Sequence, residues 1–328
     1  MRRTVFSLIG VSVYFLWLAA AQPPALAQSP AEDVVTESVP ETTPADPLVL
    51  PETEVVGRPN SFPGRPLGDE SLLTPSRSES SAARAGSSVT VIQGDEIRAM
   101  GSPTLVEVLR RVVGLNIVQA GGPGRATSVF MRGANSEHTK FLLDGIPLND
   151  PGNPTRSYDL SAFQADNIER IEVVRGPQSL VYGSDAIGGV VNIVTRRGDG
   201  PAQARLQVSG GSFGTISEVL AVQGGDERVY YSVSASHFHN EGISVVSPRF
   251  GGRERDGHES LTFATRVGWT PSERIAIDYV FRLLSATTEI DDYLVDNLTR
   301  TNHRNQLFQR IQMQSFWLDG DIEQKVGF

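Results

Sequence analysis

The chain of 328 residues is long enough for two domains. Its 29 basic and 38 acidic side chains give a formal net charge of −9, which argues against a protein dedicated to binding nucleic acid. The chain contains no cysteine, and this excludes disulfide bonds and thiolate metal sites.

Residues 1–27 have the layout of a secretory signal peptide. Arg2 and Arg3 precede an apolar stretch from Val5 to Ala21, and Ala25-Leu26-Ala27 offers a small-residue cleavage site. A retained membrane anchor is the alternative, but the helix-breaking QPP stretch favours cleavage. We therefore expect an exported protein whose signal peptide is removed.

Residues 28–85 are rich in Pro, Ser, Thr and Glu, which predicts a flexible tail without a core of its own. One stretch of this tail, LPETEVVGRP, differs from its surroundings because it contains Glu52, Thr53, Glu54, Val55 and Val56. A short β-branched run in a disordered tail can pair with the exposed strand edge of a partner. An ordinary linker is the alternative.

Residues 86–200 predict a compact mixed α/β domain. A strand is expected over Ser87–Ile92, and two short helices follow with Asp95 and Thr104 as their N-caps. KFLLDGIPL predicts two strands around an Asp144-Gly145 turn. LNIVQA, SVFM, NIERIEVVRG and VVNIVTRR predict further strands. The loop GGPGRATS lacks the Gly-Lys-Ser/Thr ending of a phosphate-binding loop and leads into a strand, so we exclude phosphate binding there.

Residues 201–328 alternate between apolar and polar side chains, as in RVYYSVSASHF, LTFATRVGW and RIAIDYVFRL. The aromatic residues Trp269, Tyr279 and Trp317 lie near predicted strand ends, and long polar connections alternate with tight turns. This pattern predicts the first strands of an antiparallel transmembrane β-barrel with a polar interior. A soluble sandwich of sheets also alternates and is the alternative.

The motifs MRGANSEHTKFLLDGIPLND and IERIEVVRGPQSLVYGSDAIGGVVNIVTRR resemble those of TonB-dependent outer-membrane transporters. The likeness extends from Ser87 to Arg197. Within this family, YGSDAIGGVVNI is most similar to the cobalamin (vitamin B12) receptors.

The resemblance implies that residues 86–200 are a plug domain inside a 22-stranded barrel and that residues 201–328 are the first strands of its wall. It implies that Glu52–Val56 is the TonB box, which binds TonB of the inner-membrane energising complex; Glu32–Glu37 is a weaker candidate. So few strands after Gly200 cannot close such a barrel. We therefore expect an incomplete barrel and a truncated or partial protein.

By this resemblance the protein is a monomer in outer-membrane lipid that takes up a scarce large ligand, a cobalamin or another corrinoid. A ferric-siderophore receptor, a surface binding protein that transports nothing and an inactive fragment are the alternatives. No set of nucleophile and base stands out, so we expect no enzymatic activity and no cofactor other than calcium.

Two outward-facing plug loops are expected to contact the ligand through Arg125, Ala126, Thr127, Ser128, Ile146, Leu148 and Asn149. Structural roles in the plug are expected for Arg132, Gly133, Asp144, Gly145, Glu172, Arg175, Gly176, Tyr182, Gly183, Gly188 and Gly189. Of these, Arg132, Glu172 and Arg175 should pair with charges of the barrel wall or with one another. The carboxylates of Asp291, Asp292 and Asp296 suit Ca²⁺ in an outer loop. A solvated acidic loop is the alternative.

Overall fold

The computed structural model describes residues 71–72, 80–81, 87–149, 152–250, 252, 255–291, 299–317 and 322–328. All of them lie in one compact unit, Arg58–Phe328. The expected signal peptide and both candidate TonB boxes, Glu32–Glu37 and Glu52–Val56, lie outside the described residues.

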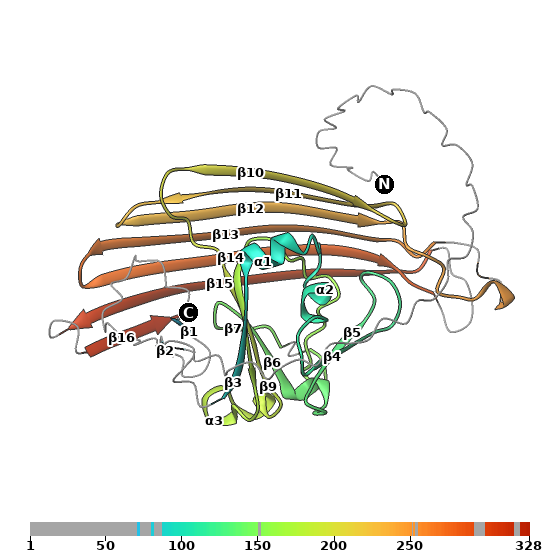
Figure 1. Ribbon diagram of the computed structural model, residues 1–328, viewed down its shortest axis with the longest axis horizontal. Helices are drawn as coiled ribbons and strands as arrows, with labels where there is room; N and C mark the ends of the chain where they lie inside the picture. The colour runs from blue at the N-terminus through green and yellow to red at the C-terminus, as the bar shows by residue number, and fades with distance from the viewer. Residues whose placement is uncertain are drawn as a thin grey trace, which may run out of the picture. The chain divides into compact units, whose positions relative to one another are not determined.

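The plug is built on a mixed five-stranded sheet in the order β3-β8-β9-β6-β7 (Figure 1). Neighbours in this sheet are antiparallel except β6 and β9, which are parallel. The hairpin of β4 and β5 and two short helices, α1 and α2, complete the plug. The bounds are β3 Ser88–Gln93, α1 Gly94–Ala99, α2 Leu105–Leu109, β4 Leu115–Gln119, β5 Thr127–Met131, β6 Thr139–Leu143, β7 Ile146–Pro147, β8 Ile168–Arg175 and β9 Gly189–Thr195.

The apolar core of the plug lies between its sheet and α2. Leu105 and Leu109 of α2 are fully buried together with Phe141, Ile171 and Ile193 of the central strands. Every residue of β9 is buried, which is expected of a central strand covered on both faces. The sequence LVEVL therefore forms a helix whose apolar side chains pack in the core.

The predicted turn signals are confirmed in most places. Asp144 and Gly145 both have positive φ (49° and 83°), as a two-residue hairpin turn requires. Thr104 precedes α2 but makes no side-chain cap hydrogen bond. The expected N-cap Asp95 is wrong: Gln93 is the N-cap of α1, and Asp95 lies two residues after it in the first turn. The sequence did not predict the helix α3, Ser179–Tyr182.

A second sheet, here called the wall, contains seven antiparallel strands in sequence order, β10 to β16. Each strand pairs with the next, and β10 and β16 are the edges of this sheet. The turns 212–214, 226–228 and 273–274 are short, whereas the connections 241–257 and 290–300 are long, as the sequence predicts. The bounds are β10 Gln203–Gly211, β11 Thr215–Gly225, β12 Val229–Asn240, β13 His258–Ser272, β14 Ile275–Glu289, β15 Thr301–Trp317 and β16 Ile322–Gly327.

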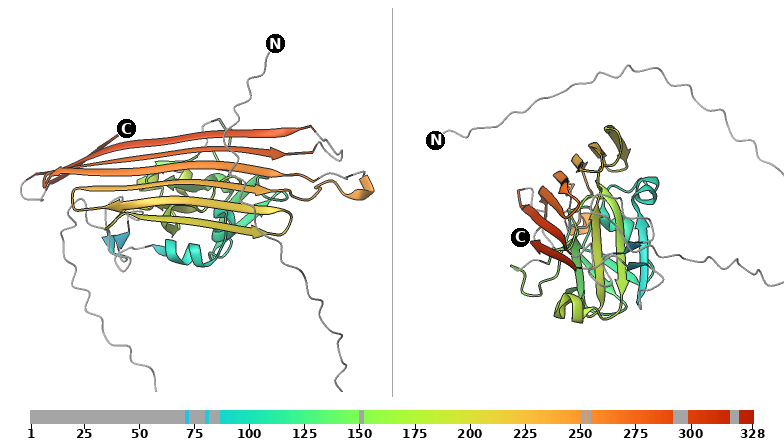
Figure 2. Two further views of the ribbon diagram at one scale, coloured as in Figure 1. Left: turned by 90° about the horizontal axis from the view of Figure 1, so that it is seen from above. Right: turned by 90° about the vertical axis from the view of Figure 1, so that its left-hand side faces the viewer.

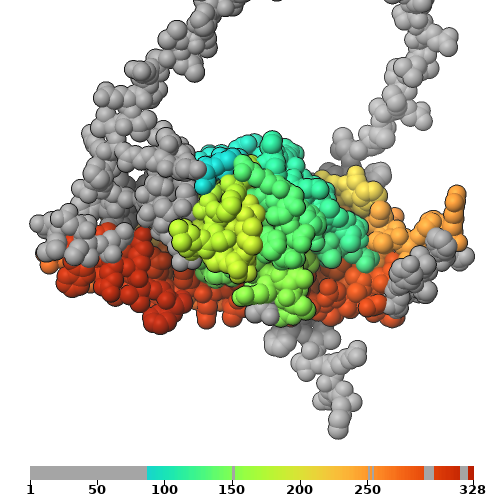
Figure 3. All heavy atoms as spheres, turned by 90° about the horizontal axis from the view of Figure 1, so that it is seen from below, coloured from blue at the N-terminus to red at the C-terminus, as the bar shows by residue number. Residues whose placement is uncertain are grey.

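The wall curves along one side of the plug (Figure 2). Seen from the plug side, the plug lies across the middle of the wall, and strands of the wall extend beyond it (Figure 3). A small antiparallel pair, β1 (Ser71–Leu72) and β2 (Ser80–Ser81), precedes the plug. None of the helices in the described ranges is long and apolar enough to cross a membrane.

The two faces of the wall differ in the way that the period-two pattern predicts. On β12, Tyr230, Ser232, Ser234 and Ser236 are buried on the plug side, and the residues between them lie on the outer face. The outer face is the side turned away from the plug. Its exposed apolar side chains include Leu206, Leu220, Phe263, Leu283, Leu307 and Met313.

Candidate functional site

The plug and the wall meet through arginines of the wall and aspartates of the plug. Arg282 Nη2 of β14 lies 2.7 Å from Asp166 Oδ1, and both side chains are only 1% exposed. The same guanidinium lies over the Phe163 ring of the plug, 4.3 Å from its centroid. A buried charge of this kind is tolerated only when it is paired and hydrogen-bonded, so the plug provides what Arg282 requires.

A second buried cluster joins the Asp144 turn to β13, β14 and β15. Arg266 contacts Asp144 at 2.9 Å and Asp278 at 3.0 Å, and Arg310 contacts Asp278 at 2.9 Å. Asp144 also accepts hydrogen bonds from the Thr195 amide (3.0 Å) and hydroxyl (2.7 Å). Asp144, which the sequence predicts only as a turn residue, is therefore also a counter-ion for the wall.

A third pair is more open to solvent and leads to the predicted ligand loop. Arg304 Nη2 of β15 lies 2.6 Å from Asp159 Oδ2, and the two side chains are 24% and 29% exposed. The other carboxylate oxygen of Asp159 accepts a hydrogen bond from the Thr127 amide (3.0 Å). Asp159 thus connects a wall strand to the start of β5.

The first predicted ligand loop, GGPGRATS, lies against the connection between β12 and β13. Arg125 Nη2 is 2.5 Å from Asp256 Oδ1 of that connection. Ala126 is exposed, Ser128 is half-buried and Thr127 is buried. The structure therefore brings Arg125 to an outer connection of the wall and leaves Ala126 as the most accessible of these four side chains.

The second predicted ligand loop lies closer to the plug interior. Leu148 is buried in the plug core at 3% exposure, and Ile146 is half-buried at the edge of the plug sheet. The Asn149 amide donates a hydrogen bond to the Arg156 carbonyl (2.8 Å). Of these three residues, Leu148 is the one that packs in the plug core, as a structural residue does.

The charged residues expected to hold the plug take the following partners. Glu172, fully buried, accepts a hydrogen bond from Arg170 of the same strand (2.8 Å). Arg175 donates to the Val113 carbonyl and to Thr90 Oγ1, both at 2.8 Å. Burial, with the nearby positive charge of Arg132, lowers the pKa of Arg175. The contacts of Arg175 therefore tie β8 to β3 and to the segment after α2, whereas the Arg170–Glu172 contact lies within β8. These partners belong to the plug and differ from the expected pairing with wall charges.

The glycines of the RGPQSLVYGSDAIGG stretch fall into two classes. Gly176, Gly183 and Gly189 all have positive φ (105°, 85° and 148°), which favours glycine. A Cβ on Gly189 would lie 2.3 Å from the Val174 carbonyl oxygen and 2.3 Å from Met131 Sδ, whereas one on Gly183 would meet nothing within 4 Å. Gly189 thus permits close packing of β9, and Gly183 permits a turn after Tyr182. Gly133 (φ 79°) is another left-handed turn position with free space beside it, and Gly188 packs near Ala134.

Only part of the predicted calcium site can be placed. Asp291 follows β14, whereas Asp292 and Asp296 lie outside the described residues. The residues that the structure describes contain no group of three or more metal-ligating side chains. Calcium binding remains a prediction.

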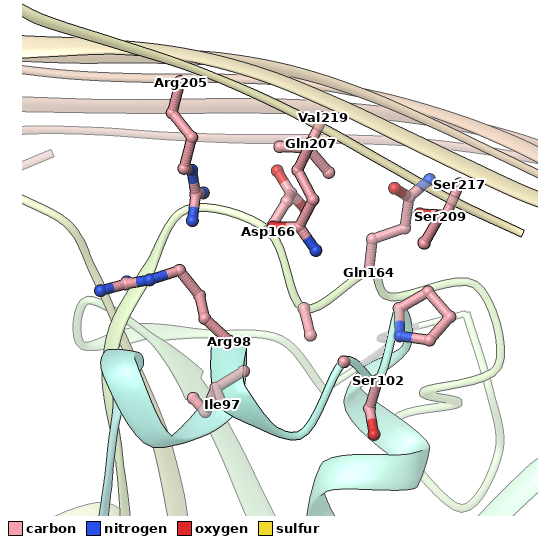
Figure 4. Close-up of a pocket in the computed structure, with 13 residues that line it drawn as sticks. Ile97, Arg98, Ser102, Gln164, Asp166, Arg205, Gln207, Ser209, Ser217 and Val219 are labelled. Atoms are coloured by element: carbon pink, nitrogen blue, oxygen red, sulfur yellow. The ribbon is translucent and has the colours of Figure 1, made fainter.

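A small polar cavity of about 30 Å³ lies between the plug and the first wall strands. Figure 4 shows Arg98 of α1 and Asp166 on one side of this cavity and Arg205 and Gln207 of β10 on the other. Arg98 and Asp166 come from the plug, and Arg205 and Gln207 come from the wall. The plug–wall boundary is therefore polar here as well.

Sequence reasoning missed Asp159 and Asp166 as partners of the wall. The alternation of the wall strands does place Arg266, Arg282 and Arg310 opposite the apolar face, and this was the available signal. No comparable periodicity marks the plug segment 152–167, so Asp166 and Asp159, the partners of Arg282 and Arg304, could not be read from it.

Comparison with known proteins agrees with this arrangement. Residues 81–190 match the model of the TonB-dependent receptor plug domain. Among solved structures, the chain is similar to the outer-membrane ferripyoverdine receptor of Pseudomonas aeruginosa: 12% identity, TM-score 0.62, covering 76% of this chain and 34% of the receptor.

Two further solved structures have the same relationship to the chain. The ferric yersiniabactin uptake receptor of Yersinia pestis shares 17% identity over 72% of this chain and 39% of its own length, with a TM-score of 0.56. A siderophore receptor of Acinetobacter baumannii shares 22% identity over 73% of this chain and 39% of its own length, with a TM-score of 0.54. The chain thus spans well under half the length of these receptors. It contains a TonB-dependent receptor plug domain, packed against an antiparallel sheet in the fold of TonB-dependent receptors.

Proposed function

We propose that this chain acts in TonB-dependent uptake of a ferric siderophore across the outer membrane. The observation that carries the proposal is the plug domain itself, paired by buried charges to a wall whose outer face is apolar. The similar solved structures are receptors named for ferripyoverdine, ferric enterobactin and ferric yersiniabactin. These names favour an iron chelate over a corrinoid.

The outer face of the wall has the dimensions of a membrane-spanning surface. On β15 it runs from Leu307 to Trp317, about 33 Å at roughly 3.3 Å per residue. A strand tilt of about 40° reduces this length to a height of roughly 25 Å, the height of the apolar band in outer-membrane barrels. Trp269 and Trp317 lie at the end nearest the short turns, where an interfacial aromatic girdle is expected.

In this proposal the ligand arrives from the side of the long connections 241–257 and 290–300. The ligand contacts are those expected from the sequence: Arg125, Ala126, Thr127, Ser128, Ile146, Leu148 and Asn149. Ala126 and Ser128 are accessible now, whereas contact through Leu148 requires the plug core to open. Glu52–Val56 adds a strand to TonB, which transmits force to the plug.

A corrinoid is the second candidate ligand, favoured by the sequence YGSDAIGGVVNI. In the structure this sequence covers the end of α3, the following turn and most of β9. Its glycines serve close packing and turns, and β9 is fully buried. The motif therefore supports the plug architecture more than it supports a particular ligand.

Binding by the detergent-solubilised 328-residue chain would test the ligand class. We expect ferric enterobactin to bind with a Kd of about 1 µM or below and cyanocobalamin to bind at least about 100-fold more weakly. The reverse order would support the corrinoid. Absence of binding by both would overturn the proposal that this chain recognises either class.

Deletion of Glu52–Val56 would test the coupling. If these residues pair with TonB, uptake of the ferric chelate by cells should be lost while binding to the chain is unchanged. Deletion of Glu32–Glu37 is the matched control, because it removes a similar β-branched run. Uptake that survives loss of Glu52–Val56 but not of Glu32–Glu37 would reassign the TonB box.

A further inference from the structure

The contact between Arg125 and Asp256 joins the outermost plug loop to the wall. The two side chains are 11% and 2% exposed, so this ion pair is largely withdrawn from water. Arg125 lies in the loop between β4 and β5, and Asp256 lies two residues before β13. Removal of one partner of such a buried pair strongly destabilises a protein, because the other partner is left as an uncompensated charge.

Asp256 also organises the connection in which it lies. Its second carboxylate oxygen, Oδ2, accepts a hydrogen bond from the Val245 amide (2.8 Å), and its own amide donates to the Ile243 carbonyl (3.3 Å). These bonds hold the start of the connection, after β12, against its end, before β13. Any loss of the ionised Asp256 side chain therefore affects both ends of the connection.

A second carboxyl group lies against the first. Asp291, two residues after the end of β14, contacts Asp256 through its side chain. Burial and this neighbouring carboxylate raise the pKa of Asp256, and Arg125 opposes the shift. One guanidinium from the plug thus offsets the repulsion between two carboxylates from two different wall connections.

The approach of the plug loop to the wall is close enough to require glycine. A Cβ on Gly124 would lie 2.1 Å from His258 Nδ1 and 2.5 Å from Thr288 Oγ1. The Thr288 hydroxyl donates to the Gly124 carbonyl at 3.4 Å and lies 2.8 Å from His258 Nδ1. The backbone before Arg125 is therefore fixed against β13 and β14. This position places the Arg125 guanidinium beside Asp256.

We propose that Arg125 is a specificity-determining residue for anionic ligands, and that an anionic group of the ligand opens the Arg125–Asp256 pair by taking its guanidinium. The proposal rests on the proposed uptake function and adds a charge requirement and a consequence to it. When Arg125 turns to the ligand, Asp256 loses its cation while Asp291 still lies against it. The connection at Ile243–Ser247 is then released from the plug, so ligand binding changes the conformation of the outer surface.

Two ferric chelates of different charge separate this role from a structural one. Ferric enterobactin is a negatively charged tris-catecholate complex, and ferrichrome is a neutral tris-hydroxamate complex of iron. Arg125→Gln should weaken ferric enterobactin binding by about tenfold or more and change ferrichrome binding by less than about twofold. Arg125→Lys, which keeps the charge, should recover part of the loss. Equal losses for both chelates would overturn the proposal.

Asp256→Asn tests the competition directly, because it removes the internal anion that occupies Arg125. This variant should bind ferric enterobactin several-fold more tightly than the wild type, with ferrichrome binding unchanged. Asp185→Asn is the matched control: it removes a carboxylate from another ion pair of the plug, Lys140 Nζ–Asp185 Oδ2 at 3.0 Å. An Asp256→Asn variant that binds ferric enterobactin no better than the control would contradict the competition.

Release of the connection can be measured without knowing the natural ligand. Arg249 is exposed within the connection, and tryptic cleavage after it reports how firmly the connection is held. Cleavage should be faster in Asp256→Asn than in Asp185→Asn, and faster in the wild type with ferric enterobactin than with ferrichrome. If neither chelate binds the wild type, the proposed function fails. The cleavage rate of Asp256→Asn then tests by itself whether the Arg125–Asp256 pair holds the connection. Unchanged cleavage would then overturn the release of the connection as well.

Discussion

The two faces of the wall sheet use the same strands for opposite purposes. On β14, Arg282 points into the plug and is 1% exposed, whereas its neighbour Leu283 lies on the outer face and is 44% exposed. The inner face contains charges that would be unstable without aspartates from a separate part of the chain. The outer face contains apolar side chains that are exposed in the described part of the chain. The difference teaches that the two faces suit different surroundings: the plug covers the inner face, and under the proposed function lipid covers the outer face.

The largest expected effect comes from removing a counter-ion of the inner face. Asp166→Asn leaves Arg282 buried without its carboxylate, which should destabilise the chain by about 3–5 kcal/mol. Equilibrium urea titration in detergent measures this change. A loss below about 1 kcal/mol would mean that the two faces are less different than the ion pair indicates.

The outer face should tolerate charge only beyond its apolar band. Ile311→Arg places a guanidinium near the middle of the band, opposite Tyr279 of β14, and should cost about 2–4 kcal/mol in lipid vesicles. Thr287→Arg, on the same face and further along β14 towards the long connection, should cost about 0–1 kcal/mol, as expected near an interface. Equal costs would argue that lipid does not cover this face.

A partly exposed ion pair of the inner face should contribute much less than a buried one. Asp159→Asn breaks the contact with Arg304, whose side chain is 24% exposed, so water can replace the carboxylate. We expect a loss of about 0.2–1 kcal/mol in the same urea titration. A loss as large as that of Asp166→Asn would show that burial does not rank these pairs.

The last expected effect is a pH dependence within the plug, away from both faces. The hydrogen bond from Lys140 lowers the pKa of Asp185, so this pair stabilises the fold above the unfolded pKa of about 3.9. That contribution should be lost as the pH falls through the lower, folded pKa. Compared with the wild type, Asp185→Asn should therefore lose less stability between about pH 4 and about pH 2. Parallel curves in acid titrations followed by circular dichroism would contradict the role of the pair.

Period-two patterns made the wall predictable from the sequence. The strands of RVYYSVSASHF and RIAIDYVFRL, their inner and outer faces, and the short turns all follow from side-chain alternation and turn residues. The register then brings Arg266 and Arg310 to the same side of the sheet. Alternation is a local property, so no knowledge of the plug was needed.

The plug partners of Arg282 and Arg304 were not predictable in the same way. Asp159 and Asp166 lie in a segment without regular strands, and their positions depend on how the plug packs against the wall. The helix α3 is only four residues long, too short for an amphipathic period to appear. Leu148 has the setting of a loop residue in the sequence, yet it is buried by tertiary packing. Long-range contacts decide these features, and the local sequence carries no signal for them.

The central claim is that plug aspartates and wall arginines depend on one another, and a double-mutant cycle on Asp166 and Arg282 tests it most directly. Each single change, Asp166→Asn and Arg282→Met, leaves one buried charge without its partner, whereas the double variant removes both charges. We predict that the double variant is more stable than the sum of the single losses implies, with a coupling free energy of about 2–3 kcal/mol. Strictly additive losses would contradict the account, because the plug and the wall would then be stabilised independently.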